Sequence, residues 1–352
     1  MLNFANVPKR FWRGVGLISI LLIFFLFVWG LGYYFSYVNR PVASVSGTQQ
    51  DSVVVEIPKG SSVKTIAEIL GRNNVIKNDF RFLILAKISG YSTRLQAGEF
   101  LMPIGKTPRE ILEFLATAKP VTYSITIPEG LTAAQIAAIF AEGKWCDEQA
   151  FLALVQDKEQ ITRFGLTSGT SLEGYLFPDT YIFTKEMYGA EKIIALMLER
   201  FKTVWGQESA GIVPPPDVDQ TVIMASIVEK ETADPAERGL IAGVFINRLA
   251  QGMKLQSDPT VVYGATDYDG VITKTHLTTP TEYNTYVIAG LPVGPICNPG
   301  REAIAAVLHP EESSNLYFVS KNDGTHQFST NLEDHNRAVQ KYQRKKKVIK
   351  GK

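Results

Sequence analysis

The N-terminal segment constrains this chain most, because it contains a run that is too long and too apolar for a small soluble core. Residues 14–39 contain no charged side chain, and Leu, Ile, Phe and Val dominate positions 21–31. About 20 residues suffice to cross a hydrocarbon core as a helix. Lys9, Arg10 and Arg13 precede the run, and this basic flank predicts an N-terminus on the cytoplasmic side.

We therefore predict a cytoplasmic segment over residues 1–14, a transmembrane helix over 15–38 and a linker over 39–51. The expected location is a single-pass anchor in the cell inner (cytoplasmic) membrane, with the rest of the chain on the periplasmic, extracytoplasmic side. A cleaved secretory signal is the alternative. The apolar run exceeds the usual signal core of about 7–15 residues, and no clean cleavage site follows it.

Charge and cysteine content exclude several classes of protein. The net charge of +1 gives no reason to expect nucleic acid as a partner. The two cysteines, Cys146 and Cys297, lie far apart and are expected to be free thiols. The four histidines lack the compact spacing of metal ligands, so we expect neither a metal site nor a cofactor.

Three stretches repeat one local pattern of a strand, a turn with Pro or Gly, a capping hydroxyl and a helix. They cover residues 55–70, 98–115 and 125–140. The pattern predicts an α+β fold class, with a first module over residues 52–118. This module looks similar to the LysM-like modules that hold glycan strands, although packing alone could also explain the pattern. The copies are too few and too unequal for a solenoid.

Glu231 is the strongest candidate for a catalytic residue. At the helical period it falls on one stripe with Ile223, Met224, Ile227 and Val228. A carboxyl group on an apolar face near a helix C-terminus should have a raised pKa and stay protonated near neutral pH, as a general acid requires. The alternative is a carboxylate paired with a neighbouring Arg or Lys.

A helix corner follows Glu231. Asp234 is expected to cap the next helix, with Pro235 at its first position and Glu237 completing a capping box. Residues 119–343 are predicted to form a mixed α+β catalytic domain with its active site at this corner, followed by a basic tail over 344–352. Polar and aromatic side chains gather on the loops before and after the corner. We expect five of them to bind substrate: Glu173, Gln256, Ser257, Tyr283 and Asn284.

Several motifs in a fixed order resemble the endolytic murein transglycosylase family, the YceG-like membrane-anchored lytic transglycosylases. They are Ile-Val-Glu-Lys-Glu-Thr at 227–232, Val-Phe-Ile-Asn-Arg-Leu at 244–249, Leu-Gln-Ser-Asp-Pro-Thr at 255–260, Tyr-Asn-Thr-Tyr at 283–286 and Gly-Leu-Pro at 290–292. The resemblance places the catalytic acid on the second Glu of Glu-Lys-Glu, which is Glu231. Val293 departs from the family, which usually repeats proline there.

The resemblance implies an enzyme that cuts peptidoglycan glycan strands internally and leaves 1,6-anhydro-MurNAc ends, with peptidoglycan synthases as partners. A single carboxyl group then suffices, whereas a hydrolytic glycosidase needs two. Three alternatives remain at this stage. One is a non-catalytic, membrane-tethered scaffold that binds peptidoglycan, another is a secreted hydrolase with Asp258 as the second carboxylate, and the weakest is a nucleophile at Ser226.

Overall fold

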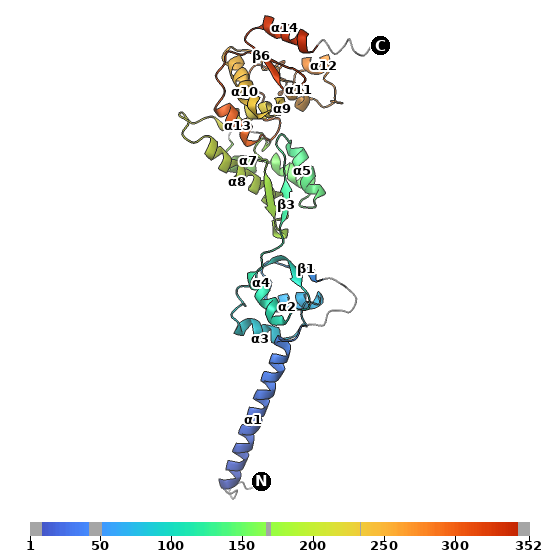
Figure 1. The fold of residues 1–352 in the computed structure, drawn as a ribbon, viewed down its shortest axis with the longest axis vertical. Helices are drawn as coiled ribbons and strands as arrows, with labels where there is room; N and C mark the ends of the chain where they lie inside the picture. Colours follow the sequence, from blue (N-terminus) through green and yellow to red (C-terminus); the bar gives the residue numbers. More distant parts are fainter. Residues whose placement is uncertain (1–8, 42–50, 167–169, 233, 344–352) are drawn as a thin grey trace. The chain divides into compact units, whose positions relative to one another are not determined.

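A computed structural model describes residues 9–41, 51–166, 170–232 and 234–343. The predicted basic tail at 344–352 lies outside the described residues, as do most of the predicted linker and of the cytoplasmic segment. The chain is a mixture of helices and short strands (Figure 1), which confirms the α+β prediction in its coarse form.

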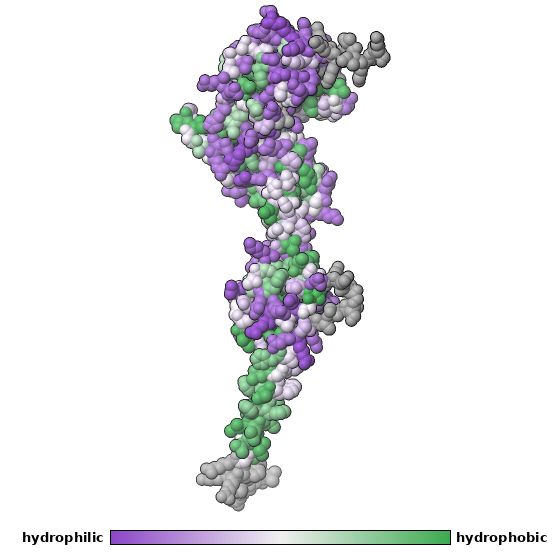
Figure 2. Space-filling view, in the orientation of Figure 1, coloured by the Kyte–Doolittle hydropathy of each residue, from purple (hydrophilic) through white to green (hydrophobic). Residues whose placement is uncertain are grey.

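The first element, α1 (Lys9–Val38), contains one segment, Gly14–Val38, that is long and apolar enough to cross a membrane. Its 25 residues rise about 38 Å as a helix, more than the roughly 30 Å of a hydrocarbon core. Side chains along most of this segment are exposed, and α1 forms a hydrophobic surface in Figure 2. The predicted N-terminal apolar helix is therefore present.

The chain divides into two compact units. Unit 1 comprises Met1–Tyr123 with Phe183–Glu186, and unit 2 comprises Ser124–Ile182 with Met187–Lys352. The division falls within two short strands, β3 (Tyr123–Thr126) and β4 (Thr180–Phe183), which form a two-stranded sheet.

Unit 1 is built on an antiparallel pair of strands, β1 (Ser52–Ile57) and β2 (Gly98–Pro103), with Ser52 opposite Pro103 and Ile57 opposite Gly98. Two helices, α2 (Val63–Arg72) and α3 (Arg81–Ile88), lie between the strands in sequence, and α4 (Pro108–Thr117) follows β2. Val55, Ile57, Phe100 and Met102 are buried on one face of the sheet, as the period of two for a strand requires, while Val54, Glu56 and Leu101 on the other face are exposed and Glu99 is buried.

The core of unit 1 also includes the end of α1. Tyr37 and Val38 are buried together with apolar side chains from the sheet and from α2, α3 and α4. These side chains include Val55, Ile57, Ile66, Leu70, Phe82, Phe100, Met102, Ile111 and Leu115. The last turn of the apolar helix is therefore part of the folded module and not a free tether.

The three predicted strand–turn–helix copies all form. Ser62 caps α2, Thr107 forms a capping box with Glu110 before α4, and Thr132 forms one with Gln135 before α5 (Ala133–Glu142). The copies at 55–70 and 98–115 share one sheet in unit 1, whereas the copy at 125–140 lies in unit 2.

Unit 2 is mostly helical. After α5 come α6 (Glu148–Val155), α7 (Lys158–Phe164), α8 (Ala190–Glu208), α9 (Val218–Glu231) and α10 (Pro235–Ala250), while the 3₁₀ turn η2 (Lys185–Met187) lies at the boundary with unit 1. The remaining elements are α11 (Asp258–Gly264), α12 (Lys274–Thr278), α13 (Arg301–Leu308), the hairpin of β5 (Tyr317–Ser320) and β6 (His326–Ser329), and α14 (Leu332–Tyr342). Helices α9, α10 and α13 pack against one another, and α14 packs on the hairpin.

Helix α9 is the central element of unit 2, and its burial differs from our expectation. The sequence predicts one apolar stripe, but every residue from Thr221 to Val228 is buried. The reason is that α9 packs against α10, α11 and α13, so that all its sides meet protein. Met224, Ile227 and Val228 form a core with residues of α10 and α13.

The prediction of how α10 begins is confirmed in part. Asp234 accepts a hydrogen bond from the Ala236 amide at 3.0 Å, and Pro235 is the first helical residue. The predicted capping box with Glu237 is wrong. Its carboxylate accepts a hydrogen bond from the His326 amide at 2.8 Å and contacts His326 Nδ1 at 2.6 Å, because β6 packs beside this helix start.

Gly174→Ala should lower the free energy of unfolding by about 2–4 kcal/mol. Gly174 has a φ of 91°, and a Cβ there would lie 2.5 Å from Pro295 and 2.9 Å from Val222. Gly165→Ala is the matched control, because its φ is 100° and a Cβ would meet no atom within 4 Å. Denaturant unfolding of both variants measures the difference, and equal losses would show that the tight contact at Gly174 is unimportant.

Candidate active site

The site is centred on Glu231, the last residue of α9. The Ser257 hydroxyl donates a hydrogen bond to Glu231 Oε1 at 2.5 Å. Among the residues that the structure describes, no Lys or Arg forms an ion pair with this carboxyl group, so the alternative of a paired carboxylate is not supported. Desolvation raises the pKa of Glu231 to about 7, and the bond from Ser257 opposes that rise.

Ser257 is held in place by a network of hydroxyl groups. Its backbone amide donates to Thr285 Oγ1 at 3.0 Å, and its carbonyl accepts from the Thr260 hydroxyl at 2.6 Å. The two threonine hydroxyls are 2.8 Å apart. Since Ser257, Thr260 and Thr285 are all buried, the network fixes the hydroxyl that faces Glu231.

A buried arginine fixes the same loop from the other side. Arg248 of α10 donates to the Leu255 carbonyl and to the Leu316 carbonyl, each at 2.6 Å. Its positive charge also lowers the pKa of Glu231, although burial of the carboxyl group outweighs this effect. Arg248 therefore joins α10, the loop before Ser257 and the segment before β5.

A cavity of about 460 Å³ lies beside the site. Lys230, the neighbour of Glu231, and Asp258, the neighbour of Ser257, both line it. Its other lining residues are Thr132, Gln135, Pro259, Val262, Tyr263 and Ile296. A cavity lined by both polar and apolar side chains suits a sugar, which presents hydroxyl groups and apolar ring faces.

The structure assigns different surroundings to the five predicted substrate-binding residues. Gln256 is exposed, with a φ of 50°, in the loop directly before Ser257. Tyr283 is half-buried, and its ring meets that of Tyr263 edge to face with centroids 4.7 Å apart. Gln256 and Tyr283 can therefore be reached from solvent, whereas Ser257 contacts Glu231.

Asn284 and Glu173 occupy structural positions instead. Asn284 is 1% exposed, and its side-chain nitrogen donates to the carbonyls of His276 at 3.0 Å and Thr279 at 2.8 Å. Glu173 accepts from the Ala133 amide at 3.0 Å and from Asn298 Nδ2 at 2.8 Å. Their polarity, which suggested sugar contacts, serves to close a loop and to cap the start of α5.

Burial raises the pKa of Glu173 to about 7 as well, so a shifted pKa alone does not single out Glu231. The two carboxyl groups differ in their partners. Glu173 accepts hydrogen bonds from the Ala133 amide, the Asn298 side chain and the Tyr263 hydroxyl. Within the described residues, Glu231 accepts one, from the Ser257 hydroxyl. A carboxyl group with few partners is the better proton donor to an external ligand.

Ser226 does not have the surroundings of a nucleophile. It is fully buried, its hydroxyl donates to the Ile223 carbonyl at 2.7 Å, and it accepts from the Ile296 amide at 3.0 Å. Its carbonyl accepts from the thiol of Cys297 at 3.3 Å. Cys146 and Cys297 are both buried and free, as predicted.

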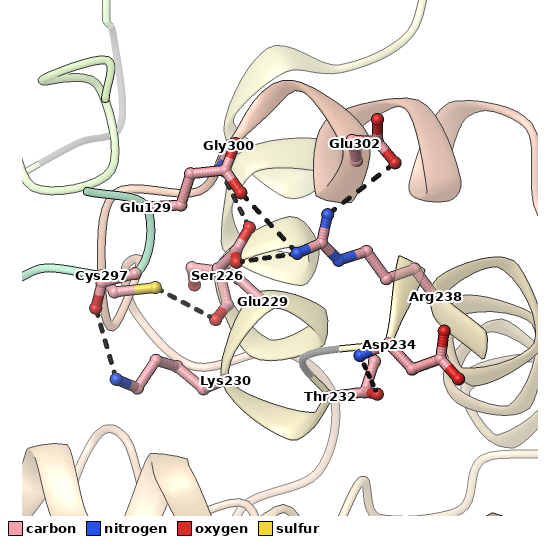
Figure 3. Close-up of polar contacts among 11 residues, drawn as sticks. Glu129, Ser226, Glu229, Lys230, Thr232, Asp234, Arg238, Cys297, Gly300 and Glu302 are labelled. Carbon is pink, nitrogen blue, oxygen red and sulfur yellow. Dashed lines mark hydrogen bonds and ion pairs between the residues drawn. The ribbon is translucent and has the colours of Figure 1, made fainter. Parts of the chain in front are cut away.

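Glu229, two residues before Glu231, has an ion-paired environment (Figure 3). Its side chain is 7% exposed and contacts Arg238 at 3.3 Å, and its Oε2 accepts from the Gly300 amide at 3.0 Å. Arg238 also contacts Glu129 at 3.7 Å and Glu302 at 4.0 Å. Glu229 is thus a structural carboxylate that holds the start of α13 against α9 and α10.

Sequence reasoning missed the residues that support the site. Arg248, Thr260 and Thr285 stand inside the motifs at 244–249, 255–260 and 283–286, but their spacing says nothing of a shared network. Tyr286 was also missed, and its hydroxyl donates to Asp258 at 2.7 Å. The sequence did contain one signal for Arg248: it lies at helical spacing from the apolar residues Ile241, Val244 and Phe245.

Taken together, the fold and the site define a mixed α+β protein in which a buried carboxyl group with a raised pKa, Glu231, is bonded by a serine hydroxyl near a cavity. The family model described as the YceG-like family matches residues 55–341. The chain therefore belongs to the YceG-like family.

Individual relatives agree with this assignment. A protein of Bacillus subtilis named endolytic murein transglycosylase is 34% identical over 327 residues, which are 89% of this chain and 91% of the relative. A protein of the same name from Streptococcus pneumoniae is 32% identical over 90% of this chain and 63% of its own length. The crystal structure of a yceG-like protein from Listeria monocytogenes has a TM-score of 0.55 and 33% identity, and the match covers 82% of this chain and 99% of that one.

Glu231→Gln and Glu229→Gln should change stability in opposite directions. The folded pKa of Glu231, about 7, exceeds its ordinary value of 4.5, so above pH 7 the fold holds a costly ionised group that is neutral below pH 4.5. Glu231→Gln should therefore stabilise the protein by up to about 3 kcal/mol at pH 8 and very little at pH 4.5.

Glu229→Gln should instead destabilise the protein at pH 8 by about 1–3 kcal/mol, because it weakens a buried ion pair. Denaturant unfolding of both variants at the two pH values measures these effects. Destabilisation by Glu231→Gln at pH 8 would contradict the assigned environment of Glu231.

Proposed function

We propose that this chain is an endolytic peptidoglycan lytic transglycosylase, which cleaves the bond between MurNAc and GlcNAc in nascent glycan strands. The observation that carries the proposal is Glu231, a carboxyl group with a pKa of about 7 that accepts a hydrogen bond from Ser257, while the sequence neighbours of both residues, Lys230 and Asp258, line a cavity. The relatives named endolytic murein transglycosylase support the same substrate.

Glu231 performs both proton transfers in the proposed reaction. Its protonated form gives a proton to the glycosidic oxygen as the bond from that oxygen to C1 of the muramic acid breaks. The resulting carboxylate takes the proton of the C6 hydroxyl of the same sugar, whose oxygen then bonds to C1. The products are a 1,6-anhydro-MurNAc end and a free GlcNAc hydroxyl, and Glu231 is protonated again.

Asp258 is a poor second carboxylate for a hydrolase. It accepts a hydrogen bond from the Tyr286 hydroxyl at 2.7 Å and lies at the first turn of α11, exposed to solvent. A hydrolytic glycosidase needs its second carboxylate free to activate water or to attack the sugar. An intramolecular hydroxyl removes that requirement, which favours transglycosylation.

The surrounding residues take separate roles in this proposal. Ser257 positions the Glu231 carboxyl group and tunes its pKa, while Gln256 and Tyr283 contact the sugar and its N-acetyl groups. Glu173 and Asn284 hold the loops that form the cavity. The helix corner after Glu231 thereby serves as the active site.

We propose that α1 anchors the reaction near a membrane and that unit 1 binds the glycan there. The antiparallel pair of β1 and β2, with two helices between its strands, supports a LysM-like module that binds the same glycan. The basic residues before the apolar segment Gly14–Val38 support an anchor with unit 2 on the periplasmic side of the inner membrane. Cutting there would set the length of new glycan strands, so peptidoglycan synthases are the proposed partners.

Glu231→Gln should abolish cleavage, lowering turnover by at least about 10²-fold, because the amide keeps the shape but cannot donate the proton. Glu229→Gln is the matched control and should keep more than about a tenth of wild-type turnover at a temperature where it is folded. The measurement is mass spectrometry of digested sacculi. Anhydro-muramyl ends indicate transglycosylation, reducing ends would indicate a hydrolase, and no new ends would indicate a scaffold.

Ser257→Ala should move the pH profile of kcat/KM. The wild-type value should fall as the pH rises through about 7, since Glu231 then loses its proton. Removing the hydrogen bond that stabilises the carboxylate raises the pKa, so the falling limb should shift to higher pH. Ser320→Ala, at a half-buried end of the β5–β6 hairpin, should leave the limb unchanged. A limb that stays in place in Ser257→Ala would contradict the role of this serine.

A further inference from the structure

Helix α3 has a second apolar face that the fold of unit 1 does not use. Phe82, Leu85 and Ala86 are buried in the core. Phe80, at the cap position, is 61% exposed, and Ile84 and Ile88 are 39% and 72% exposed. A spacing of four residues places these three side chains on one face of the helix. Three large apolar side chains in a row on a soluble surface indicate a contact with another apolar phase.

The start of α3 is fastened to α1 within the apolar segment. Arg81 donates to the Tyr33 carbonyl at 2.7 Å, and its guanidinium group lies 3.8 Å from the centre of the Tyr33 ring. Asp79 pairs with the same guanidinium at 2.6 Å, and the Tyr37 hydroxyl donates to the Lys77 carbonyl at 2.8 Å. The level of α3 relative to α1 is therefore fixed by direct contacts.

That level corresponds to the surface of a bilayer. Helical rise from position 14 to position 33 is about 30 Å, the thickness of the hydrocarbon core. If the core begins at Gly14, it ends at Tyr33, where the Trp29 and Tyr33 rings stack with centroids 5.7 Å apart. Aromatic side chains of this kind mark the interface between hydrocarbon and headgroups. Arg81, at the first turn of α3, contacts α1 at this depth.

A cavity of about 570 Å³ lies at the same junction. Arg40, Lys77 and Arg81 contribute basic side chains to it, and none of the described residues that line it is acidic. The others are Ser36, Tyr37, Pro41, Gly71, Asn74, Ile76, Asn78 and Pro108. Arg40 and Lys77 have no carboxylate partner among the ion pairs of the described residues, whereas Arg81 is paired with Asp79.

We propose that α3 is a second membrane contact: its face of Phe80, Ile84 and Ile88 lies in the interfacial layer of the bilayer, and the adjacent basic cavity binds the phosphate of an anionic phospholipid. Continuity with the apolar helix selects a membrane as the occupant, because α3 begins at the depth where α1 leaves the hydrocarbon core. Arg40 and Lys77 form no ion pair within the described part of the chain, and their positive charges select an anionic headgroup. The proposal rests on the membrane anchorage proposed above and extends it to the folded module.

The depth of α3 can be measured on the full-length protein in lipid nanodiscs. An NBD fluorophore is attached to Ile88→Cys, and quenching by doxyl-labelled lipid reports contact with the bilayer. Val54→Cys is the matched control, because Val54 is 53% exposed on β1 of the same unit. Leu22→Cys, in the middle of the apolar run, tests the anchor. Cys146 and Cys297 are buried, so the label attaches at the introduced thiol.

We expect strong quenching at Ile88 and Leu22 and at least several-fold weaker quenching at Val54. Quenching at Leu22 without quenching at Ile88 would overturn the proposal and leave the anchor intact. Absence of quenching at Leu22 would overturn both. Quenching of Ile88 only at high protein-to-nanodisc ratio, with crosslinking between copies, would show that a second copy of this chain covers the face.

The lipid preference is tested in the same system with doxyl-phosphatidylglycerol and doxyl-phosphatidylcholine at equal mole fraction. Each basic side chain near the surface should enrich the anionic lipid about fivefold, so the glycerol lipid should quench Ile88 more strongly. The double variant of Arg40→Gln and Lys77→Gln should remove this difference while quenching by total lipid persists. Equal quenching by both lipids in the wild type would overturn the assignment of the cavity to anionic lipid.

Discussion

The burial of α9 is the constraint on which unit 2 depends. Eight consecutive buried residues, Thr221–Val228, commit every side of this part of the helix to packing, and Glu231 follows within one turn at the C-terminal end. Glu231 is therefore carried into a protein environment by the packing of its own helix, and desolvation raises its pKa. The packed core helix holds a carboxyl group in a place where its ionised form is less stable than in water.

Two glutamates in one triplet illustrate how environment divides the roles of identical side chains. Glu229 meets the guanidinium of Arg238 and a backbone amide, which stabilise its charge. Glu231 accepts a hydrogen bond from the Ser257 hydroxyl and, among the described residues, forms no ion pair. Because Glu229 and Glu231 are two positions apart on a helix, their side chains point in directions more than half a turn apart. One side chain supports the fold, and the other remains free to act on a ligand.

Local patterns in the sequence predicted the parts of this protein that depend on local physics. The apolar helix, the capping hydroxyls of three helices and the position of Glu231 all follow from spacing within about ten residues. The complete burial of α9, the link from Glu237 to His326 and the structural bonds of Asn284 and Glu173 join segments distant in sequence. A polar residue on a loop is equally suited to a ligand or to a neighbouring loop, and tertiary contacts decide between them.

The burial of the two cysteines determines how the folded chain responds to oxidants. Burial raises the pKa of Cys146 to about 11 and raises that of Cys297 further, so only about one Cys146 thiol in ten thousand is ionised at neutral pH. Oxidants and disulfide-exchange enzymes react with thiolates. Once the chain is folded, both thiols are accordingly shielded from oxidation and disulfide exchange, so the native state should keep them free in an oxidising compartment.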